Sequence, residues 1–116
     1  MERIETTILQ NLIFSEEYSR KVIPFIQPDY FEDRKEKIIF EEIISFIVKY
    51  GSSITTEALN IEVENRTDLT DTEAKDIQEI TQNLKESIVD HQWLLDTTEK
   101  WCRDRAIYLA LSLIHI

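Results

Sequence analysis

The sequence is poor in the residues that make tight turns and cross-links. Its 116 residues include one glycine, two prolines and one cysteine. So few glycines and prolines argue against a small β domain built from many tight turns. A single cysteine excludes an internal disulfide and fits a reducing compartment. No apolar run approaches the roughly 20 residues that span a bilayer, so no membrane association is expected.

Basic residues are also scarce. The sequence has 13 basic and 23 acidic residues, which gives a formal net charge of −10. A protein of this sign repels phosphate backbones, so direct binding of nucleic acid by this domain is disfavoured. The charge is uneven: residues 56–90 hold ten acidic and three basic residues, whereas residues 91–116 hold three of each. The middle stretch is therefore either a solvated acidic surface or a docking face for a basic partner.

Residue patterns for catalysis, cofactors or metals are missing. One glycine cannot make a loop that cradles phosphates, so no nucleotide site is expected within this sequence. Cys102 is isolated, and neither His91 nor His115 lies at metal-ligand spacing from it or from the other. We therefore expect no catalytic residue, no cofactor and no metal ion in this chain.

Apolar residues recur every three or four positions along most of the chain, which predicts helices. In the first helix the stripe is Ile4, Ile8 and Leu12. A segment of about 17 residues ending at Tyr50 is apolar on two adjacent faces, which predicts a central helix. Gly51 follows it and fits a left-handed C-terminal cap.

The second half of the chain predicts further helices and one long final helix. Thr70 and Glu73 match the capping box that begins many helices. The helix after them carries an apolar stripe: Ile77, Ile80, Leu84 and Ile88. Asp90 can cap the last helix, from His91 to the C-terminus. The sequence thus predicts an all-α fold, a compact bundle of about six helices, with a globular head over residues 1–90 and a long C-terminal helix over residues 91–116.

The last helix is apolar on two sides. One row, spaced 4-3-4-3 like a short coiled-coil seam, is Cys102, Ala106, Leu109, Leu113 and Ile116. A second row, nearly opposite, is Ile107, Leu111 and Ile114. One side can pack on its own domain, and the other needs further chain or another copy. Either this is the core helix of the bundle, or the chain has been cut here and the helix continues into an assembly surface. In the second case the candidate self-association residues are Trp101, Cys102, Leu109, Leu113 and Ile116.

Two early segments resemble the N-terminal domain of DnaB-type replicative DNA helicases. They are residues 22–31, VIPFIQPDYF, and residues 37–44, KIIFEEII. The family pattern is an apolar helix, a Pro-x-x-aromatic turn, a few polar residues and then a helix with an Ile-Phe pair. Residues 90–94 and 98–100 resemble the branch of the family found in T-even-like phages. None of these motifs is catalytic.

The resemblance implies a ring hexamer that unwinds the replication fork 5′ to 3′ in the cytoplasm of a phage-infected bacterial host. It implies a C-terminal RecA-like motor, which uses ATP and Mg and is absent here. The N-terminal domains of such helicases form a collar, often a trimer of dimers, and contact primase; in phages a helicase loader places the ring on DNA. The last helix would lead to the hairpin or linker that pairs subunits.

A stand-alone helical adaptor protein of phage or bacterial DNA replication is the alternative. The two hypotheses differ in whether the reading frame continues past Ile116 into a glycine-rich phosphate loop.

Overall fold

A computed structural model describes residues 3–114, and within that range every regular element is a helix. The predicted all-α class is confirmed, and so is the number of α-helices, six. In chain order the elements are α1 (Ile4–Phe14), α2 (Glu16–Val22), the 3₁₀ turns η1 (Ile23–Phe25) and η2 (Pro28–Tyr30), α3 (Arg34–Tyr50), α4 (Thr56–Glu64), α5 (Asp71–Asn83) and α6 (His91–Ile114).

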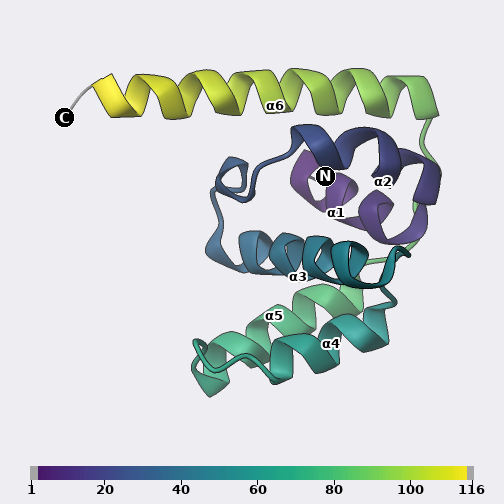
Figure 1. Ribbon diagram of the computed structural model, residues 1–116, viewed down its shortest axis with the longest axis vertical. Coiled ribbons are helices and arrows are strands. Elements are labelled where there is room, and N and C mark those ends of the chain that lie inside the picture. The colour runs from purple at the N-terminus through teal and green to yellow at the C-terminus, as the bar shows by residue number, and fades with distance from the viewer. Residues whose placement is uncertain (1–2, 115–116) are drawn as a thin grey trace.

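The helices are stacked, with α6 at one end of the stack and the α4–α5 pair at the other (Figure 1). Helices α1 and α2 lie directly beneath α6, and α3 separates them from α4 and α5. Helix α3 packs against α1, α4, α5 and η2, which confirms the prediction of a central helix. Helix α6 packs mainly on α2 and η2. We call residues 3–90 the head.

Local hydrogen bonds set the helix ends much as the sequence predicts. Thr70 and Glu73 form a complete capping box, each side chain accepting a bond from the other residue's backbone N–H. The Asp90 carboxylate accepts a bond from the backbone N–H of Trp93 at 2.8 Å and so caps α6. Gly51 has φ of 70° in the left-handed region, where a residue with a Cβ is strained.

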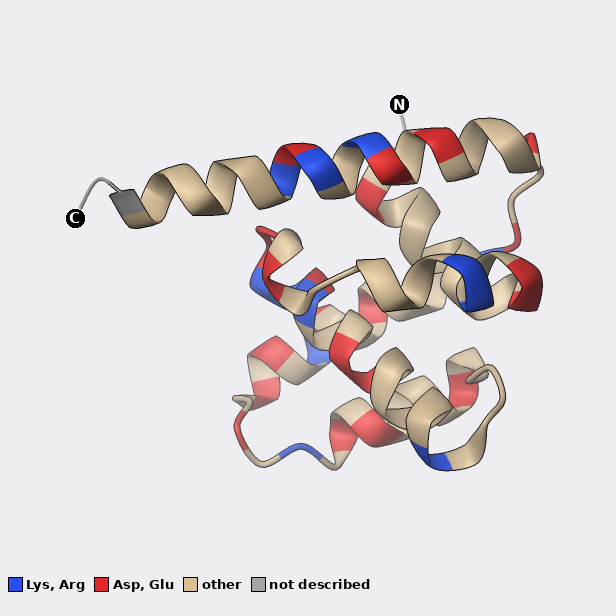
Figure 2. Cartoon of the chain, turned by 45° about the horizontal axis from the view of Figure 1, so that its top comes forward, with Lys and Arg blue, Asp and Glu red and all other residues tan. Residues whose placement is uncertain are grey.

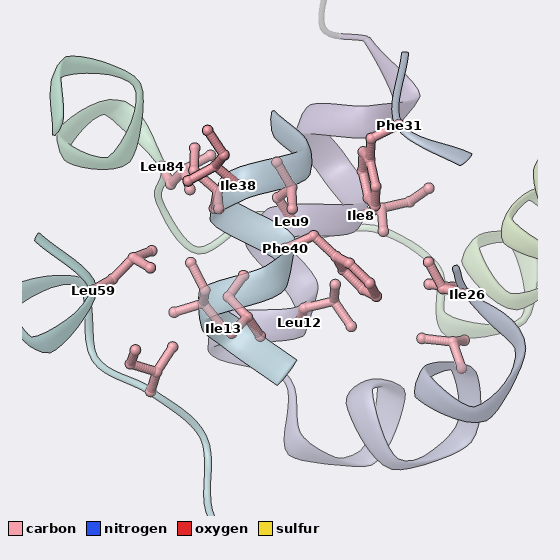
Figure 3. Packing of buried hydrophobic residues seen from close by; sticks show 14 of the residues in the cluster. Ile8, Leu9, Leu12, Ile13, Ile26, Phe31, Ile38, Phe40, Leu59 and Leu84 are labelled. Atoms are coloured by element: carbon pink, nitrogen blue, oxygen red, sulfur yellow. The ribbon is translucent and has the colours of Figure 1, made fainter. Parts of the chain in front are cut away.

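The core of the head lies between α1 and α3. The side chains of Ile8, Leu9 and Leu12 from α1 are fully buried and meet those of α3, with Phe40 at the centre (Figure 3). Phe31, from the turn after η2, packs on Phe40 with ring centroids 5.1 Å apart. Each such side chain contributes roughly 1.5–3 kcal/mol when buried. The turn therefore joins η2 to the core and places it beneath α6.

The predicted end of α5 is wrong. The apolar stripe was expected to continue through Leu84 and Ile88, but α5 ends at Asn83 and residues 84–90 have no regular structure. Leu84 is buried, whereas Ile88 is fully exposed. The backbone N–H of Lys85 donates to the Gln10 side chain at 3.2 Å, so a contact with α1 replaces a further helical turn.

Candidate self-association surface

The first half of α6 is bound to the head along one face. Leu94, Thr98 and Trp101 are buried there, and their spacing of four and three places them on the same side of the helix. The hydroxyl groups of Thr98 and Tyr18 form a buried hydrogen bond of 2.7 Å, which ties α6 to α2. This half of α6 is therefore part of the packed domain.

Trp101 anchors α6 on the head. Its ring lies 5.0 Å from that of Phe31 and 6.0 Å, edge-on, from that of Tyr30. The side chain is 8% exposed, and its indole N–H is buried without a hydrogen-bond partner among the described residues. Trp101 was a candidate for self-association because of its place on the last helix, but its ring packs on Tyr30 and Phe31 of its own domain and is almost fully buried.

Helix α6 leaves the head after Arg105. The Arg105 guanidinium donates to the carbonyl oxygen of Tyr30 at 2.6 Å and lies 4.9 Å from the ring centre of Tyr108. Beyond this point the helix projects past the other elements (Figure 1). The large apolar side chains exposed on this projecting half are Ile107, Tyr108, Leu111 and Leu113, the last of them 72% exposed.

The two apolar rows predicted for α6 have different surroundings along their length. In the first row Cys102 and Leu109 are half-buried, and Ala106 and Leu113 are exposed. Ile116, its last predicted member, lies outside the described residues. In the second row Ile107 and Leu111 are exposed. The expectation that one side would pack on its own domain holds for the first half of α6. Beyond Arg105, Leu109 is still half-buried, but Ala106 and Leu113 of the same row are exposed.

The charge of α6 is confined to its middle. All six ionised residues lie between Asp96 and Arg105, and the helix beyond them carries none (Figure 2). Lys100 pairs with Asp104 at 2.7 Å and holds the pKa of that carboxyl below its usual range, chiefly through this hydrogen bond. Burial raises the pKa of the Cys102 thiol to about 11, so the thiol is protonated at neutral pH.

A groove beside α6 was not foreseen from the sequence. It measures about 480 Å³ and is lined by Lys21, Val22, Phe25, Leu95, Thr98 and Glu99. Phe25, in η1, is 70% exposed next to it. The nearest signal in the sequence is Pro24, which cannot lie in a helix interior and follows the end of α2 within η1. Periodicity alone does not show that Leu95 lies beside Phe25.

Acidic residues are frequent on α4, α5 and the segments next to them (Figure 2). Some are paired: Arg66 bonds Glu42 and Asp68, both at 2.8 Å, and holds the pKa of Asp68 at about 2. Others are exposed and have no ion pair within the described range, namely Glu57, Glu62, Glu64, Asp71, Glu79 and Glu86. The acidic middle stretch of the sequence is therefore an acidic surface that its own cations neutralise only in part.

Two kinds of site are not found in the part of the chain that the structure describes. Residues 3–114 bring together no group of three or more His, Cys, Asp or Glu side chains that could hold a metal ion. No helix over the same range has the length and apolar character needed to cross a membrane.

Comparison with known proteins agrees with the resemblance inferred from the sequence. The family model described as "DnaB-like helicase N terminal domain" matches residues 1–92, which include α1 to α5. The chain is 37% identical over 107 residues to the "DnaB-like replicative helicase" of Enterobacteria phage T4. That match covers 92% of this chain and 22% of the phage protein, so the chain spans about a fifth of this relative's length. The chain belongs to the DnaB-like helicase N-terminal domain family.

Proposed function

We propose that this domain is the self-assembling collar of a hexameric replicative helicase and has no catalytic activity of its own. The observation that carries the proposal is the projecting half of α6, on which Ile107, Tyr108, Leu111 and Leu113 are each more than half exposed. In this proposal α6 pairs subunits, as dimers or as a trimer of dimers. The ATP- and Mg-dependent motor that unwinds DNA 5′ to 3′ belongs to a separate domain, in the cytoplasm of a phage-infected host.

The apolar area exposed on α6 is small, so it should support only weak pairing of two isolated domains. Further contacts in a hexameric ring would strengthen this pairing. Leu109 and Leu113 lie on one side of α6, the first half-buried and the second 72% exposed, so each can still gain roughly 1 kcal/mol on burial, or about 4 kcal/mol for two copies. Association costs roughly 4–15 kcal/mol in lost freedom of motion. Since this gain does not exceed the cost, we expect weak pairing of isolated domains and stable pairing only where further contacts within a hexamer add to it.

Self-association is tested by placing a charge on the projecting half of α6. Leu109→Glu or Leu113→Glu should reduce association, because each would bury an unpaired carboxylate in the contact. Sedimentation velocity measures the mass, and circular dichroism checks that the head stays folded. An unchanged mass distribution would reject this role of α6, and loss of the helical signal would show that these residues stabilise the head instead.

The acidic surface on α4 and α5 supports docking of a basic partner, which in a replicative helicase would be primase or the helicase loader. Its unpaired carboxylates would attract such a surface and speed its association. The triple variant Glu57→Lys, Glu62→Lys, Glu64→Lys should then weaken primase or loader binding, measured by light scattering of the mixed proteins. Binding unchanged for both partners would remove this surface from the proposal.

The absence of a motor from this chain has a direct test. The purified 116-residue protein should hydrolyse no ATP above a blank, because it has no loop suited to cradle phosphates. ATP turnover in proportion to the protein, copurifying with it through every column, would contradict the assignment of a non-catalytic domain.

A further inference from the structure

A small groove, which we call the α3–α4 groove, lies between those two helices on the side of the stack away from α6 (Figure 1). It measures about 90 Å³, which is too small for a cofactor but suits the end of one side chain. Positions 42, 46 and 49 of α3 are four and three residues apart, so they lie on one side of that helix. The lining residues are Glu42, Ser45, Phe46, Lys49 and Tyr50 of α3 and Glu62 of α4.

Two aromatic rings form the apolar wall of the α3–α4 groove. The ring centroids of Phe46 and Tyr50 lie 4.6 Å apart, with the ring planes tilted by 46°. Tyr50 is 60% exposed. Because the faces of aromatic rings carry negative electrostatic potential, they attract cations. The chain already shows this attraction, since the Lys49 ammonium lies 5.3 Å from the centre of the Tyr50 ring.

The two carboxylates of the groove differ in what they already bind. The Glu42 side chain is 17% exposed, and its carboxylate accepts a bond of 2.8 Å from the Arg66 guanidinium. Glu62 is exposed, and its carboxylate forms no ion pair within residues 3–114. A cationic side chain in the groove would therefore meet the Glu62 carboxylate without breaking an existing ion pair.

We propose that the α3–α4 groove binds an arginine side chain of a basic protein partner, with the guanidinium between the Tyr50 ring and the Glu62 carboxylate. The inference rests on the proposed docking of a basic partner and specifies one contact within it. A guanidinium is planar, so it can stack on an aromatic face and still donate two hydrogen bonds to a carboxylate. A lysine ammonium is more strongly hydrated and cannot make this paired contact. The flexible side chain of Lys49 would move aside from the ring.

Charge complementarity distinguishes this occupant from others. The chain carries a net charge of −10, so nucleic acid or a second acidic copy would meet repulsion. A purely apolar segment would cover the Glu62 carboxylate without giving it a partner, which is costly. A basic segment gains from the same carboxylate, and the acidic residues on α4 and α5 would attract it toward the groove (Figure 2).

The site is tested first with the side chain alone. The 116-residue protein is titrated with acetyl-arginine amide while heteronuclear NMR follows its backbone amides. The shifts should concentrate at Phe46, Lys49, Tyr50 and Glu62, and acetyl-lysine amide should bind about threefold more weakly. Shifts spread evenly over α4 and α5, or equal binding of the two probes, would overturn the inference.

Two variants remove the proposed contacts without changing the size of the groove greatly. Tyr50→Leu removes the aromatic face, and Glu62→Gln removes the charge; each should raise the dissociation constant of acetyl-arginine amide about threefold. The matched controls are Tyr108→Leu, at an exposed tyrosine of α6, and Glu64→Gln, which removes the same charge from α4 outside the groove. Controls that weaken binding as much as the groove variants would contradict a specific site.

The same variants test the groove with a whole partner. Tyr50→Leu should raise the dissociation constant of the bound partner, primase or loader, at least threefold in calorimetric titration, whereas Tyr108→Leu should not. If partner binding falls for the triple lysine variant of Glu57, Glu62 and Glu64 but not for Tyr50→Leu, the groove is refuted and docking on the acidic surface stands. If neither variant weakens binding, the proposed docking itself is refuted. Self-association that weakens in Tyr50→Leu, with partner binding unchanged, would place a second copy in the groove and overturn the inference.

Discussion

At the scale of single residues, polar contacts between distant parts of the chain are what the sequence does not reveal. Tyr18 and Thr98 are 80 positions apart, and each side chain by itself suggests nothing unusual. Glu36 is one of several glutamates on α3, yet its side chain is almost fully buried and pairs with Arg3 at 3.1 Å. Glu41 and Glu42 follow it with a similar local sequence. Burial of Glu36 depends on where the start of the chain packs, so no local pattern could predict it.

The bond between Tyr18 and Thr98 should contribute to stability. Tyr18→Phe removes the phenol hydroxyl and leaves the buried Thr98 hydroxyl without this bond, which should lower the free energy of unfolding by about 1 kcal/mol. Urea denaturation measures the loss. Tyr108→Phe is the matched control, because Tyr108 is exposed and should change stability by less than about 0.5 kcal/mol. Equal losses in both variants would contradict a special role for the buried bond.

Glu36 should make stability depend on pH. Burial raises the pKa of Glu36 above its ordinary value of 4.5, although the nearby Arg3 acts in the opposite direction. The folded state therefore binds this proton more tightly than the unfolded state, and stability falls as pH rises from the ordinary pKa through the higher folded one. Glu36→Gln should lack this decline, so its stability relative to wild type should increase over that interval.

The measurement for Glu36 is urea unfolding at a series of pH values from acidic to neutral. Glu57→Gln, which removes an exposed carboxyl from α4, is the matched control. A constant difference between Glu36→Gln and wild type at every pH would show that the folded state does not perturb this carboxyl.

At the scale of helices, ends set by neighbouring residues were predictable and ends set by distant ones were not. The Thr70–Glu73 box, the Gly51 cap and the Asp90 cap depend on a few consecutive residues, and all three predictions are confirmed. The end of α5 depends on Gln10, which is far away in the sequence, and the prediction there was wrong. The two apolar rows of α6 could be identified from spacing, but the point at which the helix leaves the head depends on contacts such as Arg105 with Tyr30.

The capping box of α5 offers a test at this scale. Thr70→Ala removes the side-chain oxygen that accepts a bond from the Glu73 N–H, at a cost of about 1 kcal/mol in the free energy of unfolding. Thr72→Ala, two positions on and exposed inside the first turn, should be neutral or slightly stabilising because alanine favours helix. Chemical denaturation of both variants compares them. A larger loss for Thr72→Ala than for Thr70→Ala would rule out the box as the feature that begins α5.

At the scale of the whole molecule, composition and periodicity were sufficient for the fold class. Few glycines and prolines, together with helical spacing, predicted an all-α bundle, and the family resemblance is confirmed by the comparisons. The groove beside α6 could not be predicted, because it exists only where η1, α2 and α6 meet. Composition also shows the large negative charge, which any assembly of these domains has to tolerate.

This charge predicts how salt affects self-association. Each copy carries a net charge of −10, so the two heads repel, while the contact on α6 is apolar and nearly neutral. Raising the ionic strength from 0.1 M to 1 M shortens the screening length from about 10 Å to about 3 Å and should therefore strengthen pairing. Sedimentation velocity at the two salt concentrations measures the change. Pairing that weakens with salt would indicate a contact made mainly by ion pairs.

The unbroken course of α6 also has a mechanical consequence. Its 24 residues form a single rod about 36 Å long, whose first half is fixed to the head through buried contacts from Leu94 to Trp101 and through Arg105. A partner that binds the free end of α6 therefore sets the orientation of the head, because α6 contains neither glycine nor proline at which it could bend. If such a partner rotated the C-terminal end of α6 by 10°, the N-terminal end of the helix would move by about 6 Å. Small motions of a neighbour would thus become large displacements of the head.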